Sequence, residues 1–532
     1  MLCNLSAFAE KYEAENASLS GGATVNGTYV SMQEGDISFA VSVQSAGTYD
    51  ILIRYANGND GSKTQNIVVN GTAAGSVVFP VTGGNTSWDE ITSVVSLIQG
   101  ANTVAITKSW GWVNIDYIDV SKHENVPFKL SPNTANPNAN AQAKKVFAFM
   151  QENFQKKIIS GVMTNEILNG NNAVALNNQT EVKYIRDNSA GKTPALVGFD
   201  FMHATGKEAG GQWQKSYSNA TVTLAKELYN KGGIPAFCWH WRDPSQNDNE
   251  FYSPSSDNTP TDFDLTTACT SAACDSWNTN SNAYKSIVAD IDVIAEYLKE
   301  LQDAGVAVLW RPVHEASGGW FWWGYKGAKP FKLLYKLIFD RLTTDKGLNN
   351  LIWVWNSDGA DADWYPGDDF VDIIGRDYYY YPRETNHASL IGEFESIKNL
   401  FGTSKMISLA ENGSVPYPDN LKNDGAGWSY FMPWYGDYVT SDNSASDWNT
   451  IMNNSYVLTL ESMPGWDAYE APTPIVSAVA GGANFDYRLL DFSQVRVYDI
   501  RGIRIFANNW AELPKGIYVV RFKGESRKIL LE

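Results

Sequence analysis

Residues 306–324 read VAVLWRPVHEASGGWFWWG, and this stretch decides the fold of the largest part of the chain. Its first five residues are an apolar run of the kind found in a buried strand. Arg311, His314 and Glu315 follow where that strand should end, and a glycine pair and four aromatic residues come next. A packed core rarely needs so many rings beside an arginine and a His-Glu pair. The stretch therefore predicts a strand end that opens into a cleft.

Around this stretch, residues 138–470 alternate between strand and helix patterns. The strand candidates are short apolar runs at 158–163, 195–199, 234–239, 306–310, 351–355, 371–374, 406–409 and 430–434. Amphipathic stretches separate most of them, for example 220–230, 284–304 and 330–341. Eight strand-helix units of this length favour a (β/α)8 TIM barrel over a doubly wound sheet. The long connection after Trp239 is expected to shape the cleft.

The regions on either side of the barrel are expected to be β-rich. Residues 10–122 contain short alternating runs at 36–43, 48–55, 66–69 and 102–107, which predict a β-sandwich of the jelly-roll kind. Residues 123–137 are rich in Pro and Asn, as in an extended linker. Residues 472–532 alternate again and are expected to form a small C-terminal β-sandwich.

Composition limits the partners of the chain. A length of 532 residues predicts about three domains. The net charge of −18 argues against binding to nucleic acid or anionic membranes. No run of 18 apolar residues is present, so no membrane span is expected. The sequence does not define the oligomeric state, and we expect a monomer.

The first residues and the cysteines indicate an exported protein. Residues 1–9, MLCNLSAFA, end in a small-x-small pattern like the remnant of a signal peptide. Cys269 and Cys274 lie in a polar loop and could form a local disulfide, which leaves Cys238 free. We therefore expect a secreted or cell-surface bacterial protein.

The ends of the predicted barrel strands carry the candidate catalytic residues. They are Asp200 and His203, His240 and Trp241, Arg311, His314 and Glu315, Asp377 with the tyrosines after it, and Glu411. Glu315 and Glu411 follow strands 4 and 7, which face each other across a barrel. Two facing carboxyls suit glycoside hydrolysis, and a separation of about 5–5.5 Å would imply retention. Arg311 has the same strand parity as Glu315, so both should point inward, and Arg311 could keep the nucleophile ionised.

Each of these residues also has a plainer interpretation. A glutamate at a strand end is often half of a salt bridge, and Asp200 and Asp377 could brace arginines at the rim. A metal site could use His240, His314 and Glu315, although close ligand spacing is missing. The two glutamates together, beside so many aromatic residues, favour catalysis.

The motifs of this region resemble glycoside hydrolase family 26, and its mannanases in particular. The matching segments are 310–324, 408–413 (SLAENG), 374–379 (IGRDYY) and 239–241 (WHW). The resemblance implies that Glu315 is the acid/base and Glu411 the nucleophile. It places Tyr379 on the nucleophile, with Tyr378 as the alternative one residue away, and makes Trp320 the sugar platform. It matches His240 and His314 to residues of the substrate site. Arg311, Asp377 and Trp323 are further candidates from their positions, and Phe321, Trp322 and Trp323 could line the cleft or pack in the core.

The chain departs from this family at Ala316-Ser317, where many relatives carry Met-Asn. We expect altered local packing there and unchanged catalytic roles. The resemblance implies an endo-β-1,4-mannanase that acts on mannan, glucomannan or galactomannan without a cofactor. The alternatives are a xylanase or β-1,3-1,4-glucanase of the same fold, a mannobiose-releasing enzyme, and a non-catalytic glycan-binding surface protein.

Residues 10–122 resemble carbohydrate-binding modules of families 35 and 6. The matching segments are 12–17 (YEAENA), 47–49 (GTY), 69–71 (VNG) and 112–120 (WVNIDYIDV). The resemblance implies sugar contacts by Trp112 and Asn114, with Tyr29 and Trp110 as weaker candidates. It also implies a structural Ca²⁺ held by Glu13, Glu15 and either Asp116 or Asp119. The alternative is that these are surface acids on edge strands.

Residues 495–521 resemble the C-terminal sorting domain of type IX secretion. The matching segments are 495–502 (VRVYDIRG) and 513–521 (LPKGIYVVR). The resemblance implies that the secretion machinery is a partner of this segment. A further sugar-binding module is the competing interpretation.

Overall fold

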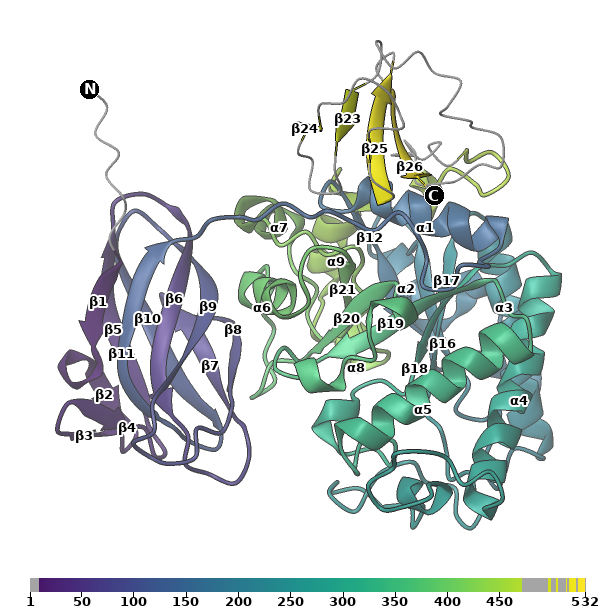
Figure 1. The fold of residues 1–532 in the computed structure, drawn as a ribbon, viewed down its shortest axis with the longest axis horizontal. Coiled ribbons are helices and arrows are strands. Elements are labelled where there is room, and N and C mark those ends of the chain that lie inside the picture. The colour runs from purple at the N-terminus through teal and green to yellow at the C-terminus, as the bar shows by residue number, and fades with distance from the viewer. Residues whose placement is uncertain are drawn as a thin grey trace. The chain divides into compact units, whose positions relative to one another are not determined.

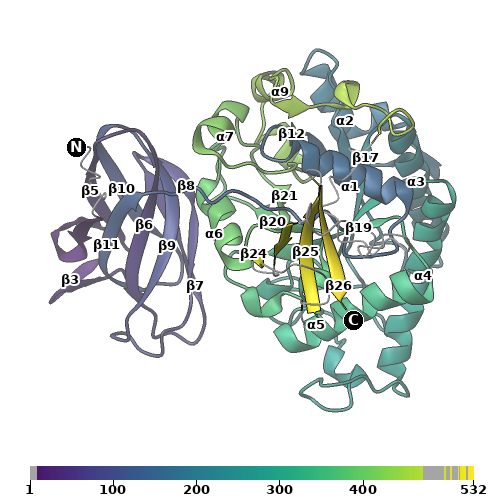
Figure 2. The same ribbon diagram turned by 45° about the horizontal axis from the view of Figure 1, so that its top comes forward.

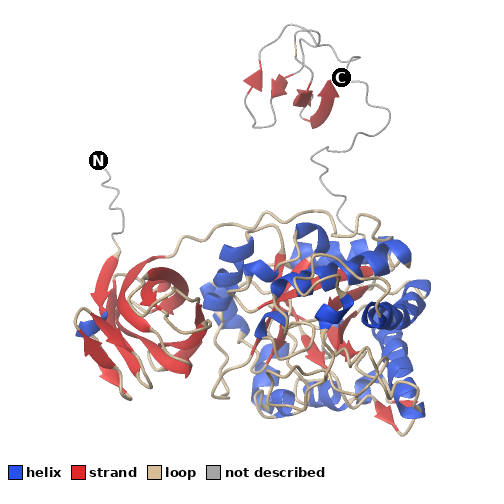
Figure 3. Cartoon of the chain, turned by 60° about the horizontal axis from the view of Figure 1, so that its bottom comes forward, coloured by secondary structure: helices blue, strands red, loops and turns tan. Residues whose placement is uncertain are grey.

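The computed structural model describes residues 9–470 and, in the C-terminal unit, residues 496–498, 504–505, 513, 516–522 and 525–531. The chain divides into two units whose boundary lies between Tyr469 and Glu470. In the first unit, strands predominate near the N-terminus, and helices surround the strands farther along the chain (Figure 3). The expected signal-peptide remnant lies outside the described residues except for Ala9.

The N-terminal part is a sandwich of two antiparallel sheets, as the alternating pattern predicts (Figure 1). One sheet has the order β3-β4-β11-β6-β9, with β1 also paired to β11, and the other has the order β2-β5-β10-β7-β8. The strands are β1 (Glu10–Glu13), β2 (Ser18–Ser20), β3 (Thr24–Asn26), β4 (Tyr29–Ser31), β5 (Asp36–Val43), β6 (Gly47–Ala56), β7 (Lys63–Val69), β8 (Thr72–Phe79), β9 (Asp89–Leu97), β10 (Gly100–Trp110) and β11 (Asn114–Lys122), with a 3-10 turn η1 (Ala14–Asn16).

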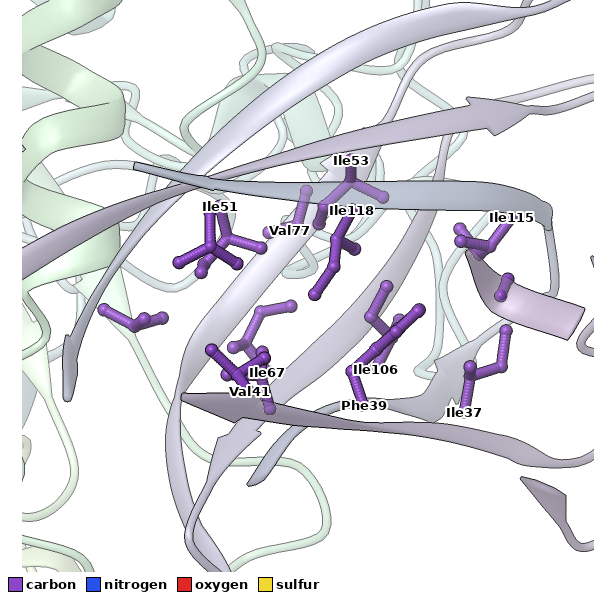
Figure 4. Close-up of a cluster of buried hydrophobic side chains, with 14 of the residues drawn as sticks. Ile37, Phe39, Val41, Ile51, Ile53, Ile67, Val77, Ile106, Ile115 and Ile118 are labelled. Atoms are coloured by element: carbon purple, nitrogen blue, oxygen red, sulfur yellow. The ribbon is translucent and has the colours of Figure 1, made fainter. Parts of the chain in front are cut away.

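Alternating side chains from both sheets form the core of the sandwich. In β5, Ile37, Phe39 and Val41 point inward and are at most 2% exposed. They meet Ile51 and Ile53 of β6, from the facing sheet (Figure 4). Burying one such side chain stabilises the fold by roughly 1.5–3 kcal/mol. The period of two along each strand therefore determines which face is buried.

The middle of the chain folds around a curled parallel sheet with the order β13-β16-β17-β18-β19-β20-β21. Its strands are β13 (Gly161–Met163), β16 (Leu196–Asp200), β17 (Ile234–Trp239), β18 (Val308–Pro312), β19 (Leu351–Ser357), β20 (Ile373–Tyr378) and β21 (Met406–Asn412). Short pairs flank it, namely β12 (Ile158–Ile159) with β22 (Val457–Leu458) and β14 (Leu168–Asn169) with β15 (Asn172–Ala173).

Residues 430–434, predicted as the eighth strand, lie between the two edges of this sheet. The N–H of Leu409 in β21 donates to the carbonyl of Tyr430 at 3.0 Å. On the other side, the N–H of Phe431 donates to the carbonyl of Ile159, and the N–H of Met163 donates to the carbonyl of Pro433. The arrangement is TIM-barrel-like, with an irregular segment in the place of one strand.

Helices cover the outside of the curled sheet (Figure 2). They are α1 (Ala141–Asn153), α2 (Thr180–Asp187), α3 (Gln212–Asn230), α4 (Asn282–Asp303), α5 (Ala328–Asp340), α6 (Ile391–Phe401), α7 (Pro418–Asp424), α8 (Asp437–Thr440) and α9 (Ala445–Met452). In α4, Ile287, Ile291, Ile294 and Leu298 recur at helical spacing and are fully buried. The Ser281 side chain caps this helix by accepting a hydrogen bond from the N–H of Tyr284 at 3.1 Å.

Single turns complete the barrel region. They are η2 (Leu176–Asn178), η3 (Leu265–Ala268), η4 (Ala316–Gly318), η6 (Ala362–Trp364), η7 (Asp368–Phe370) and η8 (Leu460–Ser462), together with a π-helical turn η5 (Arg341–Asp345). The long connection after β17 carries η3 and a disulfide between Cys269 and Cys274, which confirms the predicted pairing. Cys238 is free and buried.

The connector at 123–137 contains no helix or strand, and hydrogen bonds hold it against the barrel region. The N–H groups of Lys129 and Ser131 donate to the carbonyls of Thr403 and Ser404, at 3.0 and 2.9 Å. The N–H of Ala135 donates to a carboxylate oxygen of Asp372 at 2.6 Å. The connector is therefore docked along its length.

The sandwich also contacts the barrel region directly. The buried carboxylate of Glu393 in α6 accepts two hydrogen bonds from Ser76 in β8, from its N–H and its hydroxyl, both at 2.8 Å. The other oxygen of Glu393 accepts from the guanidinium of Arg376 in β20, at 2.7 and 2.9 Å. A buried charge pair therefore links a sandwich strand to a barrel strand that reaches the rim.

The described strands of the C-terminal unit form one antiparallel sheet, with the order β24-β23-β25-β26. They are β23 (Arg496–Tyr498), β24 (Arg504–Ile505), β25 (Gly516–Phe522) and β26 (Glu525–Leu531). The expected small sandwich is thus represented by a single sheet among the described residues. No helix in the described part of the chain is both long and apolar enough to cross a membrane.

Candidate active site

Charged side chains gather where the parallel strands of the barrel end. Arg311, Asp377 and Glu411 are each the residue before last in their strands, β18, β20 and β21. Asp200 is the last residue of β16. Because parallel strands present their carboxyl ends at one rim, these four side chains from separate parts of the sequence lie at the same end of the sheet.

Arg311 is the centre of this group. Its Nη1 donates to Asp377 at 2.8 Å and to the side-chain oxygen of Asn356 at 2.9 Å, and its Nη2 donates to Glu411. The amide nitrogen of Asn356 completes the ring of bonds by donating to Asp377 at 2.6 Å. A buried guanidinium with two carboxylate partners is a fixed positive charge. It holds Glu411 in place and favours its ionised form, as expected from the sequence.

The hydroxyl of Tyr379 donates to the second carboxylate oxygen of Glu411 at 2.9 Å. The predicted choice between neighbouring tyrosines is thereby resolved, because Tyr378 is buried and the centre of its ring lies 5.6 Å from the guanidinium carbon of Arg376. Burial, followed by the nearby carboxylates, raises the pKa of Tyr379, so that its hydroxyl remains a donor. Both oxygens of Glu411 therefore have a donor.

Glu315 comes just after the chain has left β18 at Pro312. Strand parity therefore does not set its direction, which corrects the expectation that it continues the alternation of Arg311. Val313 and Glu315 instead adopt left-handed backbone conformations, with φ of 48° and 52°. For non-glycine residues such conformations cost about 1–3 kcal/mol and occur preferentially at functional sites. The indole N–H of Trp320 donates to Glu315 at 3.0 Å and fixes its carboxyl group.

The separation of the two glutamates identifies the chemistry that they can perform. One carboxylate oxygen from each of Glu315, Asp377 and Glu411 lies within 4.8 Å of the others. Retaining glycosidases place their two carboxyls about 5–5.5 Å apart, whereas inverting enzymes need about 6.5–9.5 Å to admit a water molecule. Nearest oxygens at most 4.8 Å apart fit the shorter spacing and a direct attack by one carboxylate.

The surroundings of the two glutamates assign their roles. Burial, and then the negative charges of Asp377 and Glu411, raise the pKa of Glu315 well above its usual value. Burial also raises the pKa of Glu411 to about 7, but Arg311 opposes this increase. Glu411 thus ionises first, while Glu315 keeps its proton. A protonated acid beside an ionised carboxylate is the pair that glycoside cleavage needs.

Two histidines lie beside the pair. His240 makes two contacts with the carboxylate of Asp200. Its backbone N–H donates to one oxygen at 3.1 Å, and its Nδ1 lies 2.5 Å from the other. Asp200 therefore braces a histidine, and not an arginine as the sequence suggested. The ring of His314 lies 4.6 Å from that of His240, and its Nε2 is 3.9 Å from Glu411. Burial, then Arg311, lowers the pKa of His314, so the ring stays neutral.

The aromatic residues of the motif have two different positions. Trp320 is 40% exposed and lies beside Glu315, where a sugar ring can stack on it. Trp323 is fully buried, and its indole N–H donates to the carbonyl of His314 at 2.8 Å. This burial corrects the expectation that Trp323 contacts the substrate. Its bond to the backbone of His314 supports the loop from beneath.

Sequence reasoning missed two residues that organise the site. Asn356 links Arg311 to Asp377, and its only signal is its place directly after the predicted fifth strand. Asp361 accepts hydrogen bonds from Ser317 at 3.0 Å and from Ser357 at 2.6 Å. Ser317 belongs to the pair that departs from the family motif, so this bond shows how the chain anchors the loop of Glu315.

The metal site considered from the sequence, with His240, His314 and Glu315, does not form. Among the described residues, acidic, Cys and His atoms at metal-binding distances occur as Asp200 with Cys238 and His240, and as Glu315 with Asp377 and Glu411. Burial raises the pKa of the Cys238 thiol, which therefore stays protonated. In the group of Glu315, Asp377 and Glu411, the guanidinium of Arg311 already supplies a positive charge beside the carboxylates.

The sandwich residues predicted to bind sugar differ in how deeply they are buried. Asn114 is buried and its side chain donates to the carbonyl of Asn85 at 2.7 Å, which corrects its assignment as a free sugar ligand. Trp112 is half-buried against the core. The ring of Tyr29 packs edge-on against Trp88, with centroids 5.4 Å apart. Of the candidates named, Trp110 is the most open, at 69% exposed.

The acids of the expected Ca²⁺ site do not gather as a group. Asp116 pairs with Arg54 at 3.1 Å, and Glu13 lies 4.0 Å from Lys11. Asp119 lies opposite Lys11 in the pairing of β1 with β11. Glu15 differs from them, because one of its carboxylate oxygens is buried without a hydrogen-bond partner. That oxygen is the one feature here that fits a bound cation.

Comparison with known families gives two matches. Residues 135–462 match glycosyl hydrolase family 26, and residues 10–123 match the family 35 carbohydrate-binding module. The first match contains Glu315 and Glu411, and the second contains both sheets of the sandwich.

Individual relatives are similar to most of the chain. A mannan endo-1,4-β-mannosidase of Thermothelomyces thermophilus is 35% identical over 478 residues, which cover 86% of this chain and 91% of that protein. The solved structure of a Podospora anserina GH26-CBM35 β-(1,4)-mannanase is also 35% identical, covers 86% of this chain and 99% of its own, and has a TM-score of 0.57.

A second solved structure matches a smaller share of the chain. It is the β-mannanase from a symbiotic protist of the termite Reticulitermes speratus, in complex with a gluco-manno-oligosaccharide. It is 44% identical, covers 64% of this chain and 100% of its own, and has a TM-score of 0.57.

Proposed function

The chain belongs to glycosyl hydrolase family 26 and carries a family 35 carbohydrate-binding module, and from this membership we propose that it is an endo-β-1,4-mannanase. It hydrolyses internal β-1,4-mannosidic bonds with retention of configuration. The observation that supports this most directly is the close pair Glu315 and Glu411, with a protonated and an ionised member. The similar mannan endo-1,4-β-mannosidases indicate the substrate.

The first step joins the sugar to the enzyme. Glu411, held by Arg311 and Tyr379, attacks the anomeric carbon while Glu315 gives its proton to the glycosidic oxygen. The carbon–oxygen bond to the leaving chain breaks as the bond to the carboxylate forms. Trp320 both holds the carboxyl of Glu315 and offers an exposed ring to the sugar on that side.

The second step releases the sugar. Glu315, now ionised, takes a proton from a water molecule that attacks the anomeric carbon from the side the first leaving group left. The bond to Glu411 breaks, and its carboxylate is again stabilised by Arg311 and Tyr379. Two inversions at one carbon give a product of the original configuration.

The activity is tested by reducing-sugar release from mannan, xylan and lichenan. We expect release from mannan, and NMR of the first product should show the β-anomer before mutarotation. Release from xylan alone would point to the rival substrate. An α-anomer as first product would contradict the assignment of Glu411 as nucleophile.

For the sandwich, the proposed role is to bind the same polysaccharide and raise the concentration of substrate near the barrel. The exposed ring of Trp110 and the half-buried Trp112 support a sugar-facing end of the sandwich. A Ca²⁺ bound through Glu15 is also proposed, supported by its unpartnered buried oxygen. The ion would hold η1 to the neighbouring strands and takes no part in hydrolysis.

Export to the cell surface or medium completes the proposal. The disulfide between Cys269 and Cys274 supports an oxidising compartment. The sequence motifs of residues 495–521 support sorting by a type IX secretion system. Deletion of residues 472–532 should then leave the protein inside the cell that normally exports it, as fractionation with antibody detection would show.

A further inference from the structure

The end of β20 carries two of the residues that hold the nucleophile. Asp377 lies directly opposite Glu411 in the register of β20 and β21. Tyr379, the first residue after the strand, donates its hydroxyl to Glu411 at 2.9 Å. Arg376 and Tyr378 alternate with these two along the chain, and neither has a part in the two steps of hydrolysis. Their contacts lead to the sandwich.

Arg376 and Tyr378 are buried beside Glu393 of α6. The guanidinium of Arg376 donates to one carboxylate oxygen of Glu393 at 2.7 and 2.9 Å. Its central carbon lies 5.6 Å from the centre of the Tyr378 ring. Burial, followed by the charge of Glu393, raises the pKa of Tyr378, whereas Arg376 and a hydrogen bond with the side chain of Ser76 lower it. A residue of the sandwich therefore contacts this group.

Ser76 of β8 makes the contact from the sandwich. Its backbone N–H and its hydroxyl both donate to the second oxygen of Glu393 at 2.8 Å. A hydroxyl can donate one hydrogen bond and accept another, so the same group can serve both Glu393 and Tyr378. Hydrogen bonds to a buried carboxylate are stronger than those at an exposed surface. The contact therefore fixes the position of β20 against the sandwich.

The helix that carries Glu393 lies very close to a sandwich strand. A Cβ atom at Gly392 would lie 3.0 Å from the carbonyl oxygen of Val94 and 3.1 Å from the hydroxyl oxygen of Ser93, both in β9. Such distances are tighter than ordinary van der Waals contact. The lack of a side chain at Gly392 thus allows the close approach that brings Glu393 to Ser76.

The segment after Tyr379 is held by the same sheet of the sandwich. The side-chain amide of Asn66 in β7 donates to the carbonyl of Tyr381 at 2.9 Å. The side-chain amide of Asn386 donates to the carbonyl of Ala73 in β8, also at 2.9 Å. Tyr379 therefore lies between points of the chain that are fixed to the sandwich on both sides.

We propose that the sandwich is a positioning element of the active site, in which Ser76, through Glu393, Arg376 and Tyr378, sets the placement of β20 and of its neighbours on the nucleophile. The sandwich then contributes to the rate at which the glycosyl-enzyme forms, separately from any binding of polysaccharide. Ser76 is the positioning residue of this contact. The inference rests on the proposed mannanase activity.

The test replaces Ser76 in the full chain and uses mannotetraose, a short soluble substrate. Ser76→Asp places a second carboxylate against Glu393, and repulsion between like charges should open the contact. A misplacement of about 1 Å can cost about a hundredfold in rate, so we expect kcat to fall about tenfold. KM should stay within about twofold of the wild type. Ser76→Ala retains the N–H contact and should show a smaller loss.

Two control variants separate positioning from general effects. Ser42→Asp adds the same charge at an exposed position of β5, which β10 and β7 separate from β8 in the sheet. Val41→Ala removes a side chain from the core of the sandwich and should lower the melting temperature. Both controls should retain the kcat of the wild type at a temperature well below melting. A loss of kcat in Val41→Ala as large as in Ser76→Asp would overturn the proposal.

An aryl mannoside whose leaving group needs no proton shows which glutamate is affected. The loss in Ser76→Asp should persist with this substrate, because attack by Glu411 is still required. A loss that disappears would trace the effect to Glu315 and overturn the proposal. So would a loss seen only on insoluble mannan, since the sandwich would then act by binding alone. Without release of sugar from any mannan by the wild type, the proposed function itself fails, whereas an active wild type and an equally active Ser76→Asp reject only this inference.

Discussion

The barrel and the sandwich both carry polar residues that their sequence motifs predict to bind ligands, and they arrange these residues differently. In the barrel, side chains separated by about a hundred positions meet around Arg311, with every oxygen of Glu411 engaged. In the sandwich, the side-chain nitrogen of Asn114 donates to a neighbouring carbonyl while its oxygen is buried without a partner, and Asp116 is paired with Arg54. Parallel strands deliver their ends to one rim, whereas antiparallel strands distribute their ends over two. Site residues are therefore easier to infer in the barrel.

The largest expected effect comes from the two glutamates of the barrel. Glu411→Gln should lower kcat/KM on mannan by about 10⁴-fold or more, because no nucleophile remains. Glu315→Gln should lose roughly 10²–10⁴-fold on mannan, the contribution of a general acid. With an aryl mannoside whose leaving group needs no proton, formation of the glycosyl-enzyme by Glu315→Gln should recover, as pre-steady-state release of the phenol would show. Recovery in Glu411→Gln instead would reverse the two roles.

Substitution of Arg311 tests whether the barrel site depends on the fixed charge of its guanidinium. Arg311→Met should reduce kcat by about 10²–10³-fold, since the carboxylate loses its main stabilising partner. Activity of the wild type should fall as the pH drops through about 7, where Glu411 takes up a proton. Removing a positive neighbour makes ionisation harder, so the acidic limb of the pH profile should move to higher pH in the variant. An unchanged limb would show that Arg311 only positions the carboxylate.

The contact between the two regions is tested at Glu393. Glu393→Gln should lower the free energy of unfolding by about 3 kcal/mol, because the buried Arg376 loses its charged partner. Ser76→Ala removes the hydroxyl hydrogen bond of the same contact, retains the one from the backbone N–H, and should cost about 1 kcal/mol.

A double-mutant cycle of these two positions, measured by urea denaturation, gives their coupling. Additive effects would mean that the two regions unfold independently at this contact. Lys183→Met, which removes an exposed ion pair with Asp187, serves as the control and should leave stability unchanged.

Loss of an exposed ring in the sandwich is expected to have a smaller effect, on carbohydrate binding. In a Glu411→Gln background, Trp110→Ala should weaken retention on insoluble mannan by about threefold to tenfold, the loss of one stacking ring. Hydrolysis of mannotetraose by Trp110→Ala alone should equal that of the wild type. Unchanged retention would remove Trp110 from the proposed ligand face and favour another end of the sandwich.

The smallest expected effect concerns Ca²⁺ in the sandwich. The full chain should melt a few degrees lower in chelator than in Ca²⁺, because ligand that binds only the folded state stabilises it. Glu15→Gln should melt at the lower temperature in both solutions. Equal melting temperatures for the wild type with and without Ca²⁺ would reject the site.

Much of the site follows from the sequence, and the reason differs for each part. Glu411 and Arg311 are predictable because apolar runs mark the strands and the site lies where those strands end. Asn356 also follows a predicted strand, but its role depends on two partners from other strands, which its position alone does not indicate. Trp323 was predicted to face the sugar, but four adjacent aromatic residues cannot all face one cleft, and the backbone of 313–319 decides which turn inward.

The sequence by itself determined the alternation of strands and helices and the two facing glutamates, because these depend on local pattern and spacing. Only the tertiary structure decided the distance between the glutamates, the choice of Tyr379 over Tyr378 and the burial of Asn114. It also showed the docking of the connector and the contact between Ser76 and Glu393. Each of these depends on side chains from distant segments that meet only when the sheet curls.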